Sequence, residues 1–155
     1  MISIQKSTVA DTRTCDYTKV SKDELREASH QHIQDVWKAL YFFEERLRDT
    51  AARHDTDKIT DIDGFHRDFV HGFTEPEYTV WWRKHRQLNR HHLTHPDGTQ
   101  ADVNLIDVLD FIADCVMAGM GRSGSVSPLK LSPELLELAF QNTVTLLKEQ
   151  VVVVE

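Results

Sequence analysis

Helix-start signals followed by apolar residues at helical spacing recur along this chain, and they limit its possible folds more than any other feature. Ser21-Lys22-Asp23-Glu24 is a capping box, in which a Ser and a Glu three residues apart exchange hydrogen bonds with each other's backbone. We therefore predict a first helix over 22–49. Its apolar residues, three or four positions apart or at multiples of these spacings, are Leu25, Ile33, Val36, Leu40, Phe43 and Leu47.

Further helices are predicted downstream, each opened by a capping or proline signal. A short amphipathic segment comes first, and its apolar residues at helical spacing are Ile62, Phe65 and Phe69. Longer helices follow over about 75–92, from 104 to Gly119 or Gly121, and from 133 to about Gln150. Their start signals are Thr74-Glu75-Pro76-Glu77, Asn104 with Asp107, and Ser132-Pro133-Glu134.

The chain is therefore predicted to be all-α, with an N-terminal arm at 1–20, one helical domain over 21–150 and a tail at 151–155. Its 155 residues are enough to bury a core without disulfides or structural metals. The arm carries a short apolar stretch from Ile2 to Ile4, and the tail carries four valines, Val151 to Val154. The valines either pair with the arm or pack at an interface, and the sequence leaves both open.

Charge and composition limit the partners. The formal net charge is −7 and no basic tract is present, so long DNA or RNA is not an expected partner. A small anionic substrate is still compatible with this negative charge, because a bound cation can outweigh the charge of the chain near the site. The N-terminus is too polar for a signal peptide, and no apolar run is long enough for a membrane span. Cys15 and Cys115 show no paired metal spacing, so a soluble, reduced, cytoplasmic protein is expected.

The chain contains nine histidines, and one of them stands next to an aspartate at His54-Asp55. An imidazole nitrogen beside a carboxylate oxygen can bind one divalent cation. The segment continues as Thr56-Asp57-Lys58-Ile59, which adds a second carboxylate and a lysine. This pair is the starting point for a predicted metal site.

Three carboxylates form a stripe on the helix that starts at 104. Asp107, Asp110 and Asp114 fall within about 60° of one another around the helix axis. A solvated face is one interpretation. The helix is apolar over much of its circumference, however, and buried carboxylates need partners such as a metal or histidines.

The helix predicted over 75–92 is rich in histidine. Trp81, His85, Asn89 and His92 recur at intervals of four, four and three, which places them on one face. Four histidines, His85, His91, His92 and His95, lie within eleven residues. Buried neutral imidazoles need hydrogen bonds that a metal and its surroundings can supply. The two tryptophans, Trp81 and Trp82, could stack on a base or belong to the core.

The ordered set His32, His54-Asp55 and Asp114 in an all-α chain resembles the HD-domain superfamily of metal-dependent phosphohydrolases. His54-Asp55-Thr56-Asp57-Lys58 is similar to the His-Asp-x-x-Lys element of its dinuclear members, and Ile112-Ala113-Asp114 to its Ala-Asp ending. The string from Trp81 to His92, with Leu105-Ile106-Asp107, resembles a small uncharacterised HD-like family of bacteria and phages. The resemblance covers about residues 30–147 and implies an HD-like bundle of five to six helices.

The resemblance also implies roles for individual residues. One metal site would contain His32, His54, Asp55 and Asp114, and a second would contain His85 with one or both of His91 and His92. Asp55 would bridge the ions and, with Lys58, take part in catalysis. Asn89, Arg90 and Arg122 would contact the substrate, whereas Asp107 and Asp110 would support the ligands. The cofactor would be one or two divalent ions, Mn, Co, Fe, Ni, Zn or Mg.

The implied activity is hydrolysis of a phosphoester, a nucleotide in particular. Thr99-Gln100 after Gly98 and Ala28 early in the first helix depart from the family patterns, which argues against cyclic di-GMP as substrate and against a third metal. Two alternatives remain open: a di-iron oxygenase on the same scaffold, and a non-catalytic metal-stabilised domain that binds a nucleotide or a protein. Whether the chain forms a homo-oligomer also stays open.

Overall fold

The structure is a computed structural model that describes residues 1–7, 9, 11–95 and 97–154. It is mostly helical, as the sequence predicted. The helices are α1 (Lys22–Arg53), α2 (Asp57–Thr60), α3 (Ile62–Val70), α4 (Val80–Leu88), α5 (Leu105–Ser123) and α6 (Pro133–Lys148). A 3₁₀ turn (η1, Pro76–Tyr78) precedes α4, and two short strands are β1 (Ile2–Gln5) and β2 (Val151–Val154). The chain divides into two units, one of Met1–Glu45 with the chain end from Thr145, the other of Arg46–Val144.

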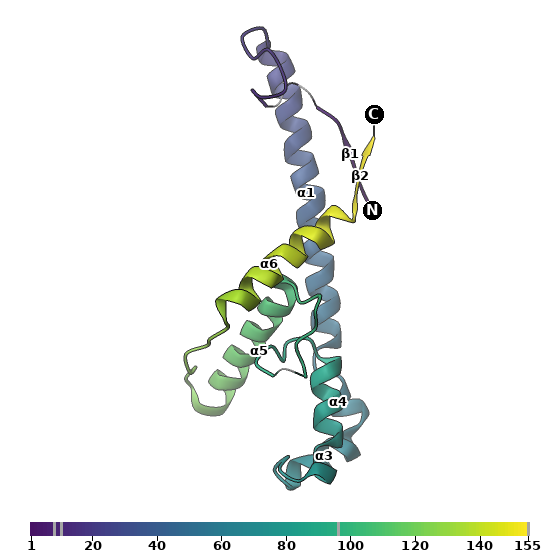
Figure 1. The fold of residues 1–155 in the computed structure, drawn as a ribbon, viewed down its shortest axis with the longest axis vertical. Helices are drawn as coiled ribbons and strands as arrows, with labels where there is room; N and C mark the ends of the chain where they lie inside the picture. Colours follow the sequence, from purple (N-terminus) through teal and green to yellow (C-terminus); the bar gives the residue numbers. More distant parts are fainter. Residues whose placement is uncertain (8, 10, 96, 155) are drawn as a thin grey trace. The chain divides into compact units, whose positions relative to one another are not determined.

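In the first unit the two ends of the chain are held together by a strand pair. β1 and β2 lie side by side and are parallel, with Ile2 opposite Val151 (Figure 1). The open question about the C-terminal valines is therefore decided in favour of pairing with the N-terminal arm. Lys38 on α1 donates to the carbonyl of Ser3 at 2.9 Å, which ties the strand to the helix. Among the residues that the structure describes in this unit, the buried apolar ones are Ile2 and Ala28.

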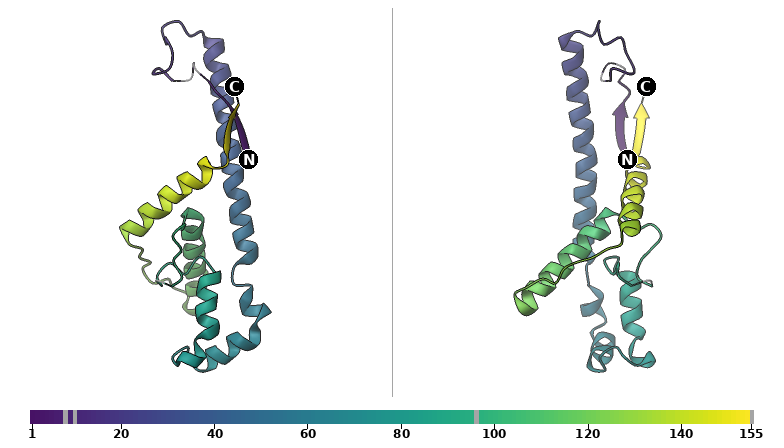
Figure 2. Two further views of the ribbon diagram at one scale, coloured as in Figure 1. Left: turned by 45° about the vertical axis from the view of Figure 1, so that its right-hand side comes forward. Right: turned by 60° about the vertical axis from the view of Figure 1, so that its left-hand side comes forward.

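The second unit has a hydrophobic core between α5, α6 and the segment before α5. Its buried members are Leu93, Val103, Val108, Phe111 and Ala139. α5 and α6 run in opposite directions (Figure 2), and the N–H of Leu105 at the start of α5 donates to Thr143 near the end of α6 at 2.8 Å. This core holds α5, which carries Asp110 and Asp114.

Local capping signals fixed several helix starts correctly. The Ser21–Glu24 capping box is present, with Ser21 N to Glu24 Oε2 at 2.9 Å and Glu24 N to Ser21 Oγ at 3.2 Å. A second capping box joins Asn104 and Asp107 at the start of α5. The end of α5 was placed too early, because the helix continues through both glycines to Ser123 and stops at Gly124, whose φ of 69° is left-handed.

The helix predicted over 75–92 is shorter than expected. Pro76 begins only the 3₁₀ turn, and α4 ends at Leu88 because Asn89 is extended, with φ −101° and ψ 106°. His91 and His92 therefore lie in a turn after the helix and do not share its face.

The start of α4 is capped by a residue from α3. Thr79 at the N-cap makes no side-chain hydrogen bond, so the first N–H groups of α4 need acceptors from elsewhere. Asp68, which is fully buried, accepts from Trp81 N at 2.8 Å and from Trp82 N at 3.1 Å. Phe65 packs on Trp81 with 4.6 Å between ring centroids. α3 thus fixes the position of α4, which carries His85.

No helix in the described part of the chain is long and apolar enough to cross a membrane.

We expect Asp68→Ala to lower the free energy of unfolding by about 2–4 kcal/mol, because two backbone N–H groups lose their acceptor inside the protein. Urea denaturation followed by circular dichroism measures this change. Asp63→Ala, also on α3 but exposed, is the matched control and should cost less than about 1 kcal/mol. Equal losses in the two variants would show that Asp68 does not hold α4.

Candidate metal centre

Asp55 lies in the sharp turn that ends α1. Its φ is 55°, in the left-handed region that few residues other than glycine adopt and that Asp and Asn tolerate best. The Asp55 N–H donates to Asn89 Oδ1 at 3.0 Å, which joins this turn to the end of α4. Such a backbone conformation costs energy and is held only where neighbouring structure requires it. Here it places the Asp55 carboxylate opposite the histidines that follow α4.

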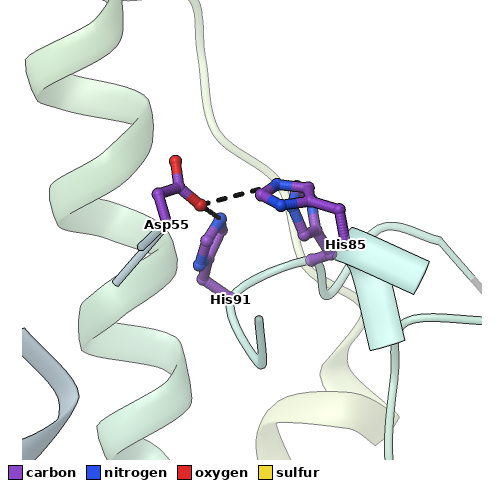
Figure 3. A group of neighbouring side chains, drawn as sticks. Asp55, His85 and His91 are labelled. Atoms are coloured by element: carbon purple, nitrogen blue, oxygen red, sulfur yellow. Dashed lines mark ion pairs between the residues drawn. The ribbon is translucent and has the colours of Figure 1, made fainter. Parts of the chain in front are cut away.

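Three imidazole Nε2 atoms surround the Asp55 carboxylate. His85 Nε2 and His91 Nε2 lie 3.5 and 3.6 Å from Oδ1 (Figure 3), and His54 Nε2 lies 3.5 Å from Oδ2. These separations are long for hydrogen bonds. Two ligand atoms that share one ion at about 2.1 Å lie roughly 3–3.5 Å apart, which matches the observed spacing.

The ligand atoms fall into two groups, in each of which they lie within 4.8 Å of one another. One group is Asp55, His85, His91 and His92; the other is His54, Asp55, His91 and Asp114. Asp55 belongs to both groups and has an oxygen facing each of them, so its carboxylate could bridge two ions. His91 also belongs to both but has only one free nitrogen to offer.

Several of these atoms are buried and lack a hydrogen-bond partner among the described residues. They are Asp55 Oδ1, His85 Nε2 and His92 Nε2, all in the first group. An unpaired polar atom inside a protein costs on the order of 1–3 kcal/mol, so three at one place call for a missing partner. A carboxylate oxygen and unprotonated imidazole nitrogens all donate electron pairs, so the partner is either a hydrogen-bond donor such as water or an electron-pair acceptor such as a metal ion. A divalent cation fits this requirement.

Two further carboxylates orient the histidines. His85 Nδ1 lies 2.9 Å from Asp57 Oδ2, and His54 Nδ1 lies 2.8 Å from Asp110 Oδ1. His91 Nδ1 makes a longer contact of 3.4 Å with the other oxygen of Asp110. A carboxylate at Nδ1 selects the tautomer with its proton there and leaves Nε2 free to bind a metal.

The site keeps two of its histidines neutral. Burial, reinforced by His91 and His85 nearby, lowers the pKa of His92 to about 3. Burial also lowers the pKa of His85, outweighing the opposing effect of Asp57. Both imidazoles are therefore in their metal-binding form at neutral pH.

Two carboxylates of the site, Asp55 and Asp110, stay ionised. Burial raises the pKa of Asp55, but the hydrogen bond and charge of Lys58 outweigh it, and the net shift is downward. The pKa of Asp110 is lowered in the same way, with burial opposed by the contacts to His91 and His54. Ionised carboxylates next to neutral imidazoles are what a divalent cation requires.

The structure brings together most of the residues predicted as metal ligands. Those in the two groups are His54, Asp55, His85, His91, His92 and Asp114. His32 is in neither group; it lies on the part of α1 that belongs to the first unit. Lys58 forms an ion pair with Asp55, and Asp110 supports two histidines.

The residues predicted to bind substrate have other contacts. Asn89 ties Asp55 to α4 and donates to Asp57 Oδ1 at 3.0 Å. Arg90 makes two hydrogen bonds of 2.8 Å to Asp107 and one of 3.0 Å to Asp102, and these carboxylates raise its pKa further. Asp107 also caps α5. Arg122 is exposed in the last turn of α5.

Asp57 is a functional candidate that the sequence interpretation left without a role. Its position in the His54-Asp55-Thr56-Asp57 segment was a usable signal, because metal-binding histidines commonly donate their second N–H to a carboxylate. Which histidine it would serve could not be read from the chain, since His85 is far away in sequence.

We expect Asp57→Ala to weaken Mn²⁺ binding about 10–100-fold, because His85 loses the carboxylate that fixes its tautomer. Calorimetric titration of the metal-free protein with Mn²⁺ measures the affinity. The exposed Asp63→Ala serves as the control and should bind like the unchanged protein. Unaltered affinity in Asp57→Ala would mean that His85 needs no such support or does not bind the ion.

Metal binding should also weaken as the pH falls. Burial lowers the pKa of His91, but the contact with Asp110 and the charges of Asp55, Asp110 and Asp114 outweigh it and hold the pKa above 6.5. A proton then competes with the metal, so the affinity should fall about tenfold per pH unit below that pKa and level off above it. Titrations with Mn²⁺ between about pH 6 and 8 test this. A flat profile would exclude His91 as a ligand.

Neither the family models nor the curated proteins nor the solved structures that we searched match this chain. Helical content and a cluster of histidines and aspartates are compatible with several functions. The function of the chain must therefore be inferred from the chemistry of its own residues.

Proposed function

We propose that this protein is a metal-dependent phosphohydrolase with an HD-like helical fold, acting on a phosphoester and on a nucleotide in particular. The order of its ligands supports this proposal, since His54-Asp55 and the distant Asp114 resemble the HD-domain superfamily. The single observation that carries it is the set of unpartnered atoms, Asp55 Oδ1, His85 Nε2 and His92 Nε2, facing one another in a buried place.

The donor set suits a divalent transition metal. Imidazole nitrogens and carboxylate oxygens together favour Mn, Fe, Co, Ni or Zn, whereas Mg prefers oxygen alone. Asp55, His85, His91 and His92 would hold one ion; His54 and Asp114, with the second oxygen of Asp55, would hold another. A bound ion would activate a water molecule to act as the nucleophile at neutral pH, and it would offset the negative charge of the phosphoryl oxygens.

The reaction that follows from this site is hydrolysis. Water adds to phosphorus, the bond from phosphorus to the ester oxygen breaks, and the leaving oxygen takes a proton. Lys58 is placed to assist, because its ammonium group already contacts the Asp55 carboxylate. If an ion were bound at Asp55, Lys58 could donate to a phosphoryl oxygen of the substrate.

The proposal is tested by supplying the purified protein with Mn²⁺, Co²⁺, Mg²⁺, Ni²⁺ or Fe²⁺ and with nucleoside mono-, di- and triphosphates and cyclic nucleotides. We expect at least one metal to support release of phosphate or of a shortened nucleotide. Chromatography of the reaction mixture measures these products. His54→Ala should reduce the rate about 100-fold or more, because it removes a ligand. His66→Ala is the matched control, an exposed histidine on α3.

Three results would contradict the proposal. Activity unchanged in His54→Ala would refute the site. Turnover that consumes dioxygen, with a mixed-valent iron signal, would identify an oxygenase. Tight nucleotide binding without turnover under any metal would identify a binding domain.

A further inference from the structure

A small hollow lies beside the proposed metal centre, within the second unit. Its volume is about 110 Å³, and it is bordered by the end of α1, the end of α4 and the first turns of α5. His54, one of the candidate ligands, forms part of its wall. A molecule in this hollow would therefore contact His54 and Asp110, which accepts from His54.

Most charges in the wall of the hollow are already paired. Arg90 is held by Asp107 and Asp102, and Asp107 Oδ2 also accepts from Asn104 N at 2.9 Å. Asp110 faces the Nδ1 atoms of His54 and His91. These groups hold the structure together and have little capacity left for a ligand.

Arg53 is different. It lines the hollow directly before His54, its side chain is exposed, and its Nε donates to the carbonyl of Asp49 at 3.2 Å. Among the residues that the structure describes, no carboxylate lies within ion-pair distance of its guanidinium group. The two terminal nitrogens can thus donate to an anion, and a guanidinium matches the geometry of phosphate oxygens.

The size of the hollow limits what can enter it. Sites that enclose a whole drug-sized ligand are about 300 Å³ or larger. The hollow is smaller than that and opens to solvent, so it can hold a tetrahedral phosphoryl group while the rest of a larger molecule stays outside.

We infer that this hollow is the phosphoryl-binding pocket of the proposed site, with Arg53 as its anion-binding residue. The inference rests on the proposed function. The substrate class is then a phosphomonoester that is recognised through its phosphoryl group, while the rest of the molecule stays outside the hollow. Because the nucleoside would stay outside the hollow, we expect the protein to discriminate little between nucleosides.

The test measures binding of inorganic phosphate to the Mn²⁺-loaded protein by calorimetry. Arg53→Ala should weaken phosphate binding at least about tenfold, and Arg53→Lys should restore part of the loss, because it returns the charge without the two-pronged geometry. Arg83→Ala, an exposed arginine on α4, is the control and should not change binding. The affinity for Mn²⁺ itself should be the same in all three variants.

A second measurement uses p-nitrophenyl phosphate and the four common nucleoside monophosphates as substrates. We expect KM values within about tenfold of one another, and a higher KM with nearly unchanged kcat for the aryl phosphate in Arg53→Ala. A preference above about 100-fold for one nucleoside would overturn the inference, as would phosphate binding that is absent or unaffected by Arg53→Ala. A loss of phosphate binding that only accompanies a loss of Mn²⁺ binding would also overturn it.

The results separate the two proposals. Phosphate binding that depends on Arg53, without hydrolysis of any phosphoester, would keep the pocket and reject the hydrolase. Metal-dependent hydrolysis with the same KM and phosphate affinity in Arg53→Ala would keep the hydrolase and reject the pocket.

Discussion

Hydrogen bonds between buried histidines and carboxylates are the interaction on which the candidate site depends. Asp57 at Nδ1 of His85 and Asp110 at Nδ1 of His54 fix which nitrogen carries the proton. The opposite nitrogens, Nε2 of both rings, then face Asp55. Without these bonds the imidazoles could rotate or change tautomer, and the buried, unpartnered atoms would no longer face one another.

The backbone around the site is shaped by two helix ends. α1 stops where Asp55 takes a left-handed conformation, and α4 stops where Asn89 becomes extended. The Asn89 side chain links the two by accepting from Asp55 N and donating to Asp57. Helix ends leave free backbone groups, and here these groups and their caps position the ligands. The same ends border the hollow that contains Arg53, so the ligands and the inferred phosphate pocket share one scaffold.

Most residues of the two candidate metal-binding groups could be named from the sequence, whereas the roles of their neighbours could not. His54 and Asp55 stood out as an adjacent pair and Asp114 as part of an acidic stripe, and the resemblance joined them in one site. The histidines at 85–92 stood out by their number. His32 does not join them, because α1 runs unbroken from Lys22 to Arg53 and the chain does not turn back between His32 and His54. Arg90 was expected to bind substrate, but its partners are carboxylates that the chain brings near only by folding.

The sequence by itself determined the helical class and the starts of α1, α5 and α6, because capping hydrogen bonds join residues within one turn and need no distant partner. Only the tertiary structure decided that Val151–Val154 pairs with Ile2–Gln5, that α4 ends before His91, and that Asp57 supports His85. These outcomes depend on contacts between segments far apart in the chain. The energies of such contacts come from burial and from partners that no local pattern identifies. The sequence shows His54 and Asp55 as a pair, but the fold decides which imidazole nitrogens face the Asp55 carboxylate.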